Sequence, residues 1–143
     1  MKKFRFTLET VLACERRREK NDIAALAAVR QRIREKLNLR DQLGRQIAAL
    51  EARAAGSTAG ELRGRADFVQ WLIQERIRLA YEAEALRTDE QACLAALHET
   101  RKRVRMLEKV RETQLAQYEY SLSRQQDREM EEITARYMRY HHG

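Results

Sequence analysis

The glycine-rich stretch Ala55-Gly56-Ser57-Thr58-Ala59-Gly60-Glu61-Leu62-Arg63-Gly64 interrupts a chain that contains no proline. Three of the five glycines lie in it, and the other two are Gly44 and Gly143. Because glycine adopts left-handed backbone conformations and weakens helices, we expect the chain to bend here. On both sides lie long, charge-rich segments with apolar residues three or four positions apart, a spacing typical of amphipathic helices. The stretch therefore predicts the bend of a helical hairpin.

The composition favours long helices packed along a narrow interface rather than a thick globular core. Charged residues make up 36% of the 143 residues, aromatic residues only 6%, and proline is absent. Such proportions are typical of long helices and coiled coils. We therefore expect one all-α domain over residues 1–143, without an enzymatic cleft.

The net charge of +7 suits nucleic acid, an anionic lipid surface or an acidic protein surface. A solvated helix surface with a basic bias is the plainer alternative. Cys14 and Cys93 are isolated from each other, which favours a reduced, cytosolic chain. The sequence has no run of 18 apolar residues that would predict a membrane span, and its basic start lacks the apolar stretch of a signal peptide.

The first helix is expected over about residues 7–55. Thr7 is a candidate N-cap, and Phe6 and Val11 have the spacing of a hydrophobic staple. Gly56 is expected at the C′ position, just past the end of this helix.

The bend is expected over about residues 56–61 and the second helix over about residues 62–140. Thr58 and Glu61 have the spacing of a capping box, which marks the start of a helix. No glycine or proline interrupts the chain between Arg65 and the final residue, so this second helix is predicted to be the longer one.

An antiparallel hairpin pairs residues whose numbers add up to a constant, because both helices rise equally per residue. One alignment brings apolar positions of the two segments together: Leu8 with Leu107, Leu12 with Val104, Ile23 with Cys93, Ile33 with Ala83, Leu37 with Leu79, Leu43 with Leu72 and Ile47 with Phe68. It also places Arg40 near Arg76, so these like charges need an acidic neighbour. The predicted fold class is an antiparallel two-helix coiled-coil hairpin with a longer, projecting C-terminal helix.

In this alignment the last part of the second helix, residues 112–143, has no partner within the chain. About 30 helical residues would project about 40 Å. The segment still carries large apolar side chains at Leu115, Tyr118, Leu122, Met130, Ile133, Tyr137, Met138 and Tyr140. An isolated helix is only marginally stable, so we expect this segment either to fray or to bind a partner.

Two basic clusters are brought together by the same alignment, and we call them the basic belt. Its members are Arg16, Arg17, Arg18, Lys20, Arg101, Lys102, Arg103 and Arg105. An acidic protein partner and a solvated surface without a partner are the main interpretations, and nucleic acid or lipid is a further one.

The densest large apolar patch follows the bend and consists of Phe68, Trp71, Leu72 and Ile73. The alignment predicts that Phe68 and Leu72 face the partner helix and that Trp71 points away. Packing at the bend and docking of a partner are both open interpretations of this patch.

Residue types that carry catalysis are sparse and scattered. His98 is expected at the surface, and His141 and His142 lie at the end of a helix, where adjacent residues do not share a face. Histidines and carboxylates show no metal-ligand spacing, and the glycine-rich loop that holds nucleotide phosphates is absent. We expect no catalytic residues, no metal and no cofactor.

The opening Phe4-Arg5-Phe6-Thr7-Leu8-Glu9-Thr10-Val11-Leu12, followed by Glu15-Arg16-Arg17-Arg18-Glu19, resembles the start of the FliJ family. Members of this family are the coiled-coil components of the flagellar type III export apparatus. The resemblance covers the first 20 residues, and the patch Phe68-Val69-Gln70-Trp71-Leu72-Ile73 resembles an aromatic patch of the family more loosely. Glu75 and Arg76 occupy the next turn, where the family often has leucine.

The resemblance implies a non-enzymatic stalk that inserts its paired helix ends into the ring of the export ATPase hexamer and stimulates it. It further implies binding to the cytoplasmic linker of the membrane export gate, escort of export chaperones, and a location in the cytoplasm at the flagellar base. The residues expected to meet the ATPase are Leu8, Leu12, Arg16, Arg17, Arg18, Arg101, Arg103, Tyr118 and Leu122, and those expected to meet the gate are Phe68, Trp71 and Leu72.

Two other functions stay open at this point. One is the equivalent stalk of a virulence type III secretion system, and the other is a basic coiled coil that binds nucleic acid with steep salt dependence. Because the resemblance implies protein partners, nucleic acid is not expected to bind.

Overall fold

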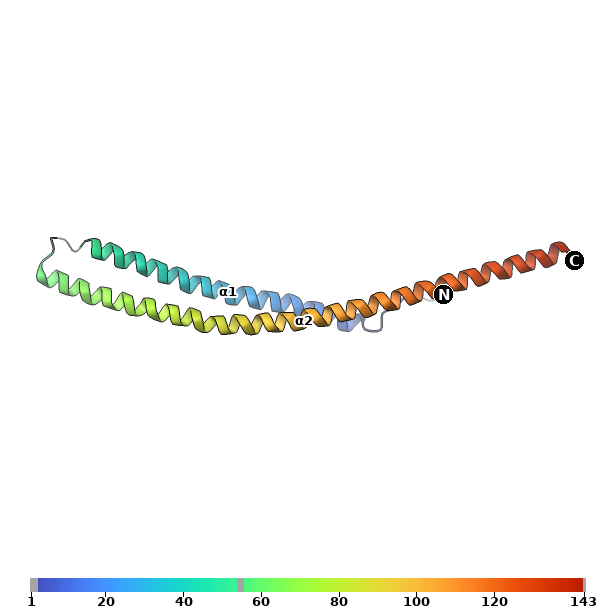
Figure 1. Cartoon of the computed structure of the whole chain (residues 1–143), viewed down its shortest axis with the longest axis horizontal. Helices are drawn as coiled ribbons and strands as arrows, with labels where there is room; N and C mark the ends of the chain where they lie inside the picture. Colours follow the sequence, from blue (N-terminus) through green and yellow to red (C-terminus); the bar gives the residue numbers. More distant parts are fainter. Residues whose placement is uncertain (1–2, 54–55, 143) are drawn as a thin grey trace. The chain divides into compact units, whose positions relative to one another are not determined.

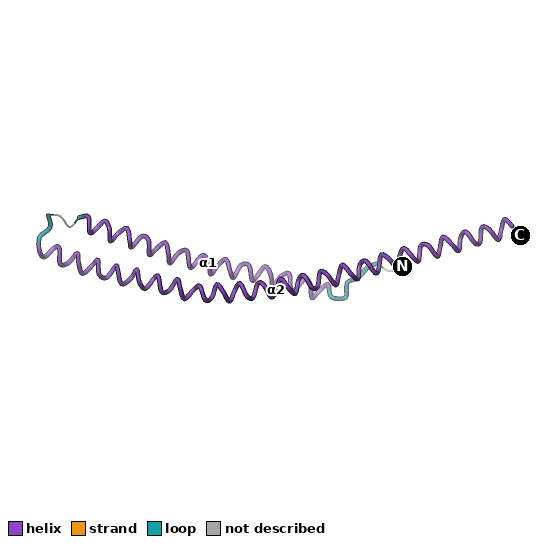
Figure 2. Tube along the Cα trace, in the orientation of Figure 1, coloured by secondary structure: helices purple, strands orange, loops and turns teal. Residues whose placement is uncertain are grey.

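The computed structural model describes residues 3–53 and 56–142. Within these residues the chain is all-helical, with α1 at Glu9–Ala52 and α2 at Ala59–His142, and it contains no strand (Figure 2). The two helices pack against each other, so the predicted all-α class is confirmed.

The chain divides into two compact units, and both helices contribute to each. Unit 1 consists of residues 1–19 and 99–143, and unit 2 consists of residues 20–98. In unit 2, α1 and α2 lie side by side over their whole shared length (Figure 1). Each unit has its own set of contacts between the helices.

The first helix begins later than predicted, at Glu9 instead of Thr7. The Leu12 amide donates the first helical hydrogen bond to the Leu8 carbonyl at 2.9 Å, and the Glu9 amide donates to the Phe6 carbonyl at 3.1 Å. These bonds make Leu8 the N-cap residue. The carboxylate of Glu9 lies in the first turn, where the helix dipole favours negative charge.

The predicted staple between Phe6 and Val11 is wrong. Phe6 is buried in a cluster with Leu12 and Val104, whereas Val11 stays 46% exposed. Phe4 and Leu107 pack against the same cluster. Phenylalanine buries more apolar surface by reaching across to α2 than by covering the first turn of its own helix, so the longer contact is formed.

The connection between the helices lies about three residues earlier in the chain than the predicted bend over residues 56–61, because α1 ends earlier and α2 begins earlier than expected. α1 ends at Ala52, and the predicted end at Ala55 lies outside the described residues. Gly56 has a φ of +82°, a conformation that glycine adopts without strain. The Arg65 guanidinium donates to the Arg53 carbonyl at 2.6 Å and to Ser57 Oγ at 3.2 Å, which ties the connection to α2.

The predicted capping box is present and sets the start of α2. The Thr58 amide donates to Glu61 Oε2 at 3.3 Å, and the Glu61 amide donates to Thr58 Oγ1 at 3.3 Å. With Thr58 as the N-cap, the helix begins at Ala59. The predicted start at residue 62 was therefore three residues late, because the box outweighs the weak helix propensity of Gly60.

Buried positions recur every seven residues along each helix, the period of helices that wind around each other. In α1 the buried side chains at this spacing are Leu12, Leu26, Ile33 and Ile47, and half-buried Glu19 and Arg40 occupy the intervening places. In α2 the buried positions are Leu72, Leu79, Ala83, Leu97, Thr100 and Val104. The same repeat thus includes both apolar and charged side chains.

The predicted pair of Leu12 with Val104 is found in one buried cluster, but the ion pairs between the helices indicate an alignment shifted by about three residues, nearly one helical turn. In unit 1, Glu15 pairs with Arg103, whereas the predicted alignment opposes it with Thr100 or Arg101. The predicted pair of Ile47 with Phe68 is also wrong, because Ile47 is buried and Phe68 is 46% exposed. Apolar residues repeat every three or four positions, so apolar matching alone does not separate two alignments one turn apart.

In unit 2 the shifted pairing separates the two arginines that the sequence placed together. Arg40 pairs with its neighbour Asp41 at 3.3 Å, while the Arg76 guanidinium lies over Gly44. A Cβ atom at Gly44 would come within 3.3 Å of Arg76 Cζ. The glycine therefore gives an arginine room to lie against the backbone of α1.

Replacement of this glycine by alanine tests two opposing effects. Alanine has the higher helix propensity, but its Cβ atom takes space that the Arg76 guanidinium occupies. We expect Gly44→Ala to raise the free energy of unfolding by up to about 1 kcal/mol, because alanine favours the helix and Arg76 has a flexible end that moves aside. Urea unfolding followed by circular dichroism measures the change. Gly64→Ala is the matched control, since a Cβ there meets no atom within 4 Å. A loss of stability in Gly44→Ala alone would show that the position of Arg76 is fixed.

Candidate functional site

Half-buried carboxylates of α1 bind arginines of α2 in unit 1. Arg103 Nε donates to Glu15 Oε2 at 3.1 Å, and the Glu15 side chain is only 16% exposed. Glu19 pairs with Arg101 at 3.9 Å, and Arg18 lies 3.6 Å from Glu15. Because a half-buried carboxylate without a partner would be destabilising, these arginines have a structural role.

The outer members of the basic belt are only partly neutralised. Arg16 donates to Glu108 at 3.4 Å, an exposed ion pair that contributes little to stability. Lys102 pairs with Glu99 at 3.4 Å. Within residues 3–53 and 56–142, Arg17 has no hydrogen bond or ion pair, and it is exposed. Lys20 belongs to unit 2, and the other members belong to unit 1.

The N-terminal residues before α1 lie against α2 in unit 1. The ring centres of Phe4 and Tyr118 are 5.6 Å apart, and the Arg111 guanidinium carbon lies 6.0 Å from the centre of the Phe4 ring. Arg111 also donates to Glu9 Oε2 at 3.2 Å. Tyr118 is half-buried as a result, so the covered face of α2 extends at least one turn past Arg111.

The residues expected to meet an ATPase differ in their accessibility. Leu12 is completely buried in the cluster with Phe6, so its role in this structure is packing. Leu8 is 38% exposed and Leu122 is half-buried. The three arginines at 16–18 are exposed. The sequence pattern did not separate Leu12 from Leu8, because both lie on the apolar side of the first turn.

Beyond Leu122 the surface of α2 is open. Every residue from Ser123 to His141 is exposed, including several large apolar side chains. These are Met130 at 62%, Ile133 at 59%, Tyr137 at 62%, Met138 at 55% and Tyr140 at 89% exposure. The predicted open apolar segment is therefore found from Ser123 to His141, whereas the prediction that residues from 112 onward have no intrachain partner is wrong at Tyr118, whose ring lies against Phe4.

The aromatic patch lies in unit 2 and is divided between surface and core. Phe68 and Trp71 stack with their ring centres 6.1 Å apart and an angle of 10° between the planes, and Trp71 is 56% exposed. Leu72 is 1% exposed and packs between the helices. Trp71 points outward as predicted, but Phe68 is 46% exposed beside it, so the prediction that Phe68 faces the partner helix is wrong.

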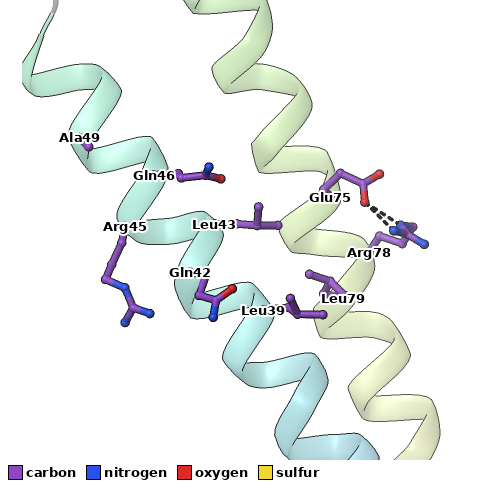
Figure 3. Close-up of a pocket in the computed structure, with 9 residues that line it drawn as sticks. All are labelled: Leu39, Gln42, Leu43, Arg45, Gln46, Ala49, Glu75, Arg78 and Leu79. Carbon is purple, nitrogen blue, oxygen red and sulfur yellow. Dashed lines mark hydrogen bonds and ion pairs between the residues drawn. The ribbon is translucent and has the colours of Figure 1, made fainter.

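A groove opens between α1 and α2 in unit 2 (Figure 3). The residues that α2 contributes to it follow the aromatic patch closely in the sequence. Leu39, Leu43 and Leu79 form its apolar floor, and polar side chains stand around them. On α2, Arg78 donates to Glu75 at 2.5 Å, and this bond together with the charge of Glu75 raises the pKa of Arg78 above its ordinary value. The bonded pair holds both side chains at the edge of the groove.

The ion pairs between α1 and α2 were not predicted from the sequence, and two of those found among the described residues lie in unit 2. Lys36 Nζ lies 2.8 Å from Glu82 Oε2, and Arg30 Nε donates to Glu90 Oε2 at 3.4 Å. The hydrogen bond from Lys36 is the main cause that lowers the pKa of Glu82, and its positive charge and that of Arg78 act in the same direction. The sequence does contain a sign of these ion pairs. Lys36 and Glu90 occupy places in the seven-residue repeat that apolar residues fill elsewhere.

Among the described residues, no three of His, Cys, Asp and Glu are placed to hold a metal ion, and neither helix is long and apolar enough to cross a membrane. Cys14 and Cys93 are free thiols.

Comparison with known proteins identifies no relative: no protein-family model, no curated protein and no solved structure matches this chain. Its function is therefore inferred from its own residues and their arrangement.

The lowered pKa of Glu82 predicts a pH dependence of stability. The carboxylate stabilises the fold when ionised, so its contribution is present above the ordinary pKa of 4.5 and is lost as the pH falls through the lowered pKa. Glu82→Gln should be less stable than wild type at neutral pH, and the difference should shrink below pH 4.5. Glu84→Gln is the control, because Glu84 is 77% exposed and, within residues 3–53 and 56–142, pairs only with Arg87 on its own helix. A difference that is constant with pH would contradict the assignment.

Proposed function

We propose that this chain is a non-enzymatic stalk of a flagellar protein export apparatus, as its N-terminal resemblance to the FliJ family implies. It binds and stimulates the ring of an export ATPase, contacts the membrane export gate and escorts export chaperones. In this proposal the two helices form an antiparallel coiled-coil hairpin, and the C-terminal part of α2 projects beyond α1. In this proposal the chain acts in the cytoplasm at the flagellar base.

The observation that supports this proposal most is the role of the residues that carry the resemblance. The aromatic side chains of Phe4 and Phe6 contact α2 at Tyr118 and Val104, respectively, and Leu12 completes the cluster. A segment that joins the start of α1 to α2 in this way makes the paired helix ends a single structural element. Such an element suits insertion into a ring better than two independent helix ends do.

The distribution of charge in unit 1 favours a protein partner over nucleic acid. Arg16, Arg101 and Arg103 each pair with a glutamate of the other helix, which reduces the positive charge that a phosphate backbone would meet. An alternating set of charges matches a protein surface that carries both signs. The exposed arginines without a partner, such as Arg17, then supply the attraction to acidic residues of the ring.

Stimulation of ATP turnover tests the proposal. Addition of the chain to the cognate export ATPase should raise the rate, and the double variant Arg17→Glu/Arg105→Glu should need roughly tenfold more protein for the same effect, which corresponds to about 1.4 kcal/mol of binding. Both arginines are exposed, and within the described residues neither makes an ion pair, so the fold should be kept. Arg63→Glu in unit 2 makes the same kind of charge change and should have no effect. A full-length chain that leaves the ATPase rate unchanged would refute the stalk function.

A separate prediction concerns the gate. Trp71→Ala should weaken binding to a fragment of the export gate linker while the free energy of unfolding changes little, because the ring is 56% exposed. Leu72→Ala is the contrast: it removes a buried side chain and should cost about 2–5 kcal/mol of stability. Titration calorimetry and urea unfolding separate the two effects. If Trp71→Ala unfolds the protein as readily as Leu72→Ala, the tryptophan belongs to the packing.

A further inference from the structure

The exposed end of α2 carries an apolar stripe that continues the face covered by the N-terminal residues in unit 1. Tyr118 and Leu122 are half-buried on this face. Steps of four and three residues lead from Leu122 through Gln126 to Met130, Ile133 and Tyr137. Residues at these steps lie on one side of a helix. The stripe therefore extends the apolar contact surface of α2 by about four helical turns.

Charged residues border this stripe on one edge in a particular order. Glu129 comes immediately before Met130, and Arg136 comes immediately before Tyr137, so both lie on the same edge of the stripe. The Glu129 carboxylate accepts a hydrogen bond of 3.4 Å from Gln125. Arg136 makes only an exposed contact of 4.0 Å with Glu132 of its own helix. Both charges thus remain accessible to a second chain.

We propose that the C-terminal parts of α2 from two copies of this chain pair with each other in antiparallel orientation through this stripe. In an antiparallel pair of helices, one edge of the stripe faces the same edge of the copy. With Met130 opposite Ile133 of the copy, Glu129 lies beside Arg136 of the copy, and by symmetry the contact occurs twice. Like charges are not opposed along this edge.

The parallel orientation lacks this complementarity. Each edge of the stripe then faces the opposite edge of the copy, which places Glu129 beside Thr134 and Arg136 beside His141. Neither contact joins opposite charges. The charge order along α2 therefore selects the antiparallel pair.

The expected association is weak. The shared stretch of about 20 residues is about 30 Å long and buries only a few large side chains from each copy. Stable interfaces bury about 1,200–2,000 Å² in total, more than such a pair of single helices provides. The pairing is thus concentration-dependent and leaves the same surface available to a tighter partner.

Sedimentation velocity on the purified full-length chain at increasing concentration tests this inference. Wild type should shift reversibly toward the dimer, and Ile133→Glu should remain monomeric because it places a charge in the stripe. Ala135→Glu adds the same charge on the opposite face of the helix and should associate like wild type. If wild type is monomeric at all concentrations, or if Ile133→Glu associates equally well, the inference is wrong.

Charge exchange tests the orientation. Glu129→Arg alone opposes two arginines at each contact and Arg136→Glu alone opposes two glutamates, so each variant should be monomeric. A mixture of the two restores both opposite-charge contacts and should dimerise at least tenfold more tightly than either variant alone. The double variant Glu129→Arg/Arg136→Glu should associate like wild type. Circular dichroism verifies that every variant keeps its helix content.

Equal association of the mixture and the single variants would refute the antiparallel pairing. These measurements use this chain alone, so their outcome is independent of any ATPase. A chain that stimulates an ATPase without dimerising would contradict only this inference, and one that dimerises without stimulating an ATPase would contradict only the proposed function.

Discussion

The alignment of the two helices depends on half-buried charges that meet an opposite charge on the other helix. Glu15 and Lys36 occupy places in the seven-residue repeat that would otherwise be apolar, and each contacts a charged residue just beside that repeat on α2. Apolar contacts hold the helices together, but they repeat every three or four residues and tolerate a shift by one turn. A half-buried ion without its partner does not tolerate that shift. The ion pairs therefore define the register within each unit.

The same pairing explains why three arginines of unit 1 are not available for binding. Arg103 and Arg101 neutralise half-buried glutamates, and the cation of Arg111 is shared between Glu9 and the Phe4 ring. A charge can stabilise the fold or attract a partner, and these three arginines do the former. The surfaces left for partners are the exposed arginines, the stacked Phe68 and Trp71, and the apolar stripe at the end of α2.

Much of the local structure was predictable because it depends on neighbours in the sequence. The capping box at Thr58 is complete within four residues, and the left-handed Gly56 is a property of the residue itself. The outward direction of Trp71 follows from its place between buried positions three and four residues away. The staple at Phe6 failed for the opposite reason: the ring found a larger apolar contact on α2, nearly one hundred positions away in the sequence.

The sequence by itself determined that the chain forms two long helices with a break between them, which residues of each helix are apolar, and which segment of α2 has no counterpart in α1. Helix period, glycine and capping chemistry are local properties, so they can be derived without the partner helix. Only the tertiary structure decided the register, and with it which side chains are free. Phe68 is exposed and Leu12 is buried because of where the other helix lies, and that position is set by contacts between residues far apart in the chain.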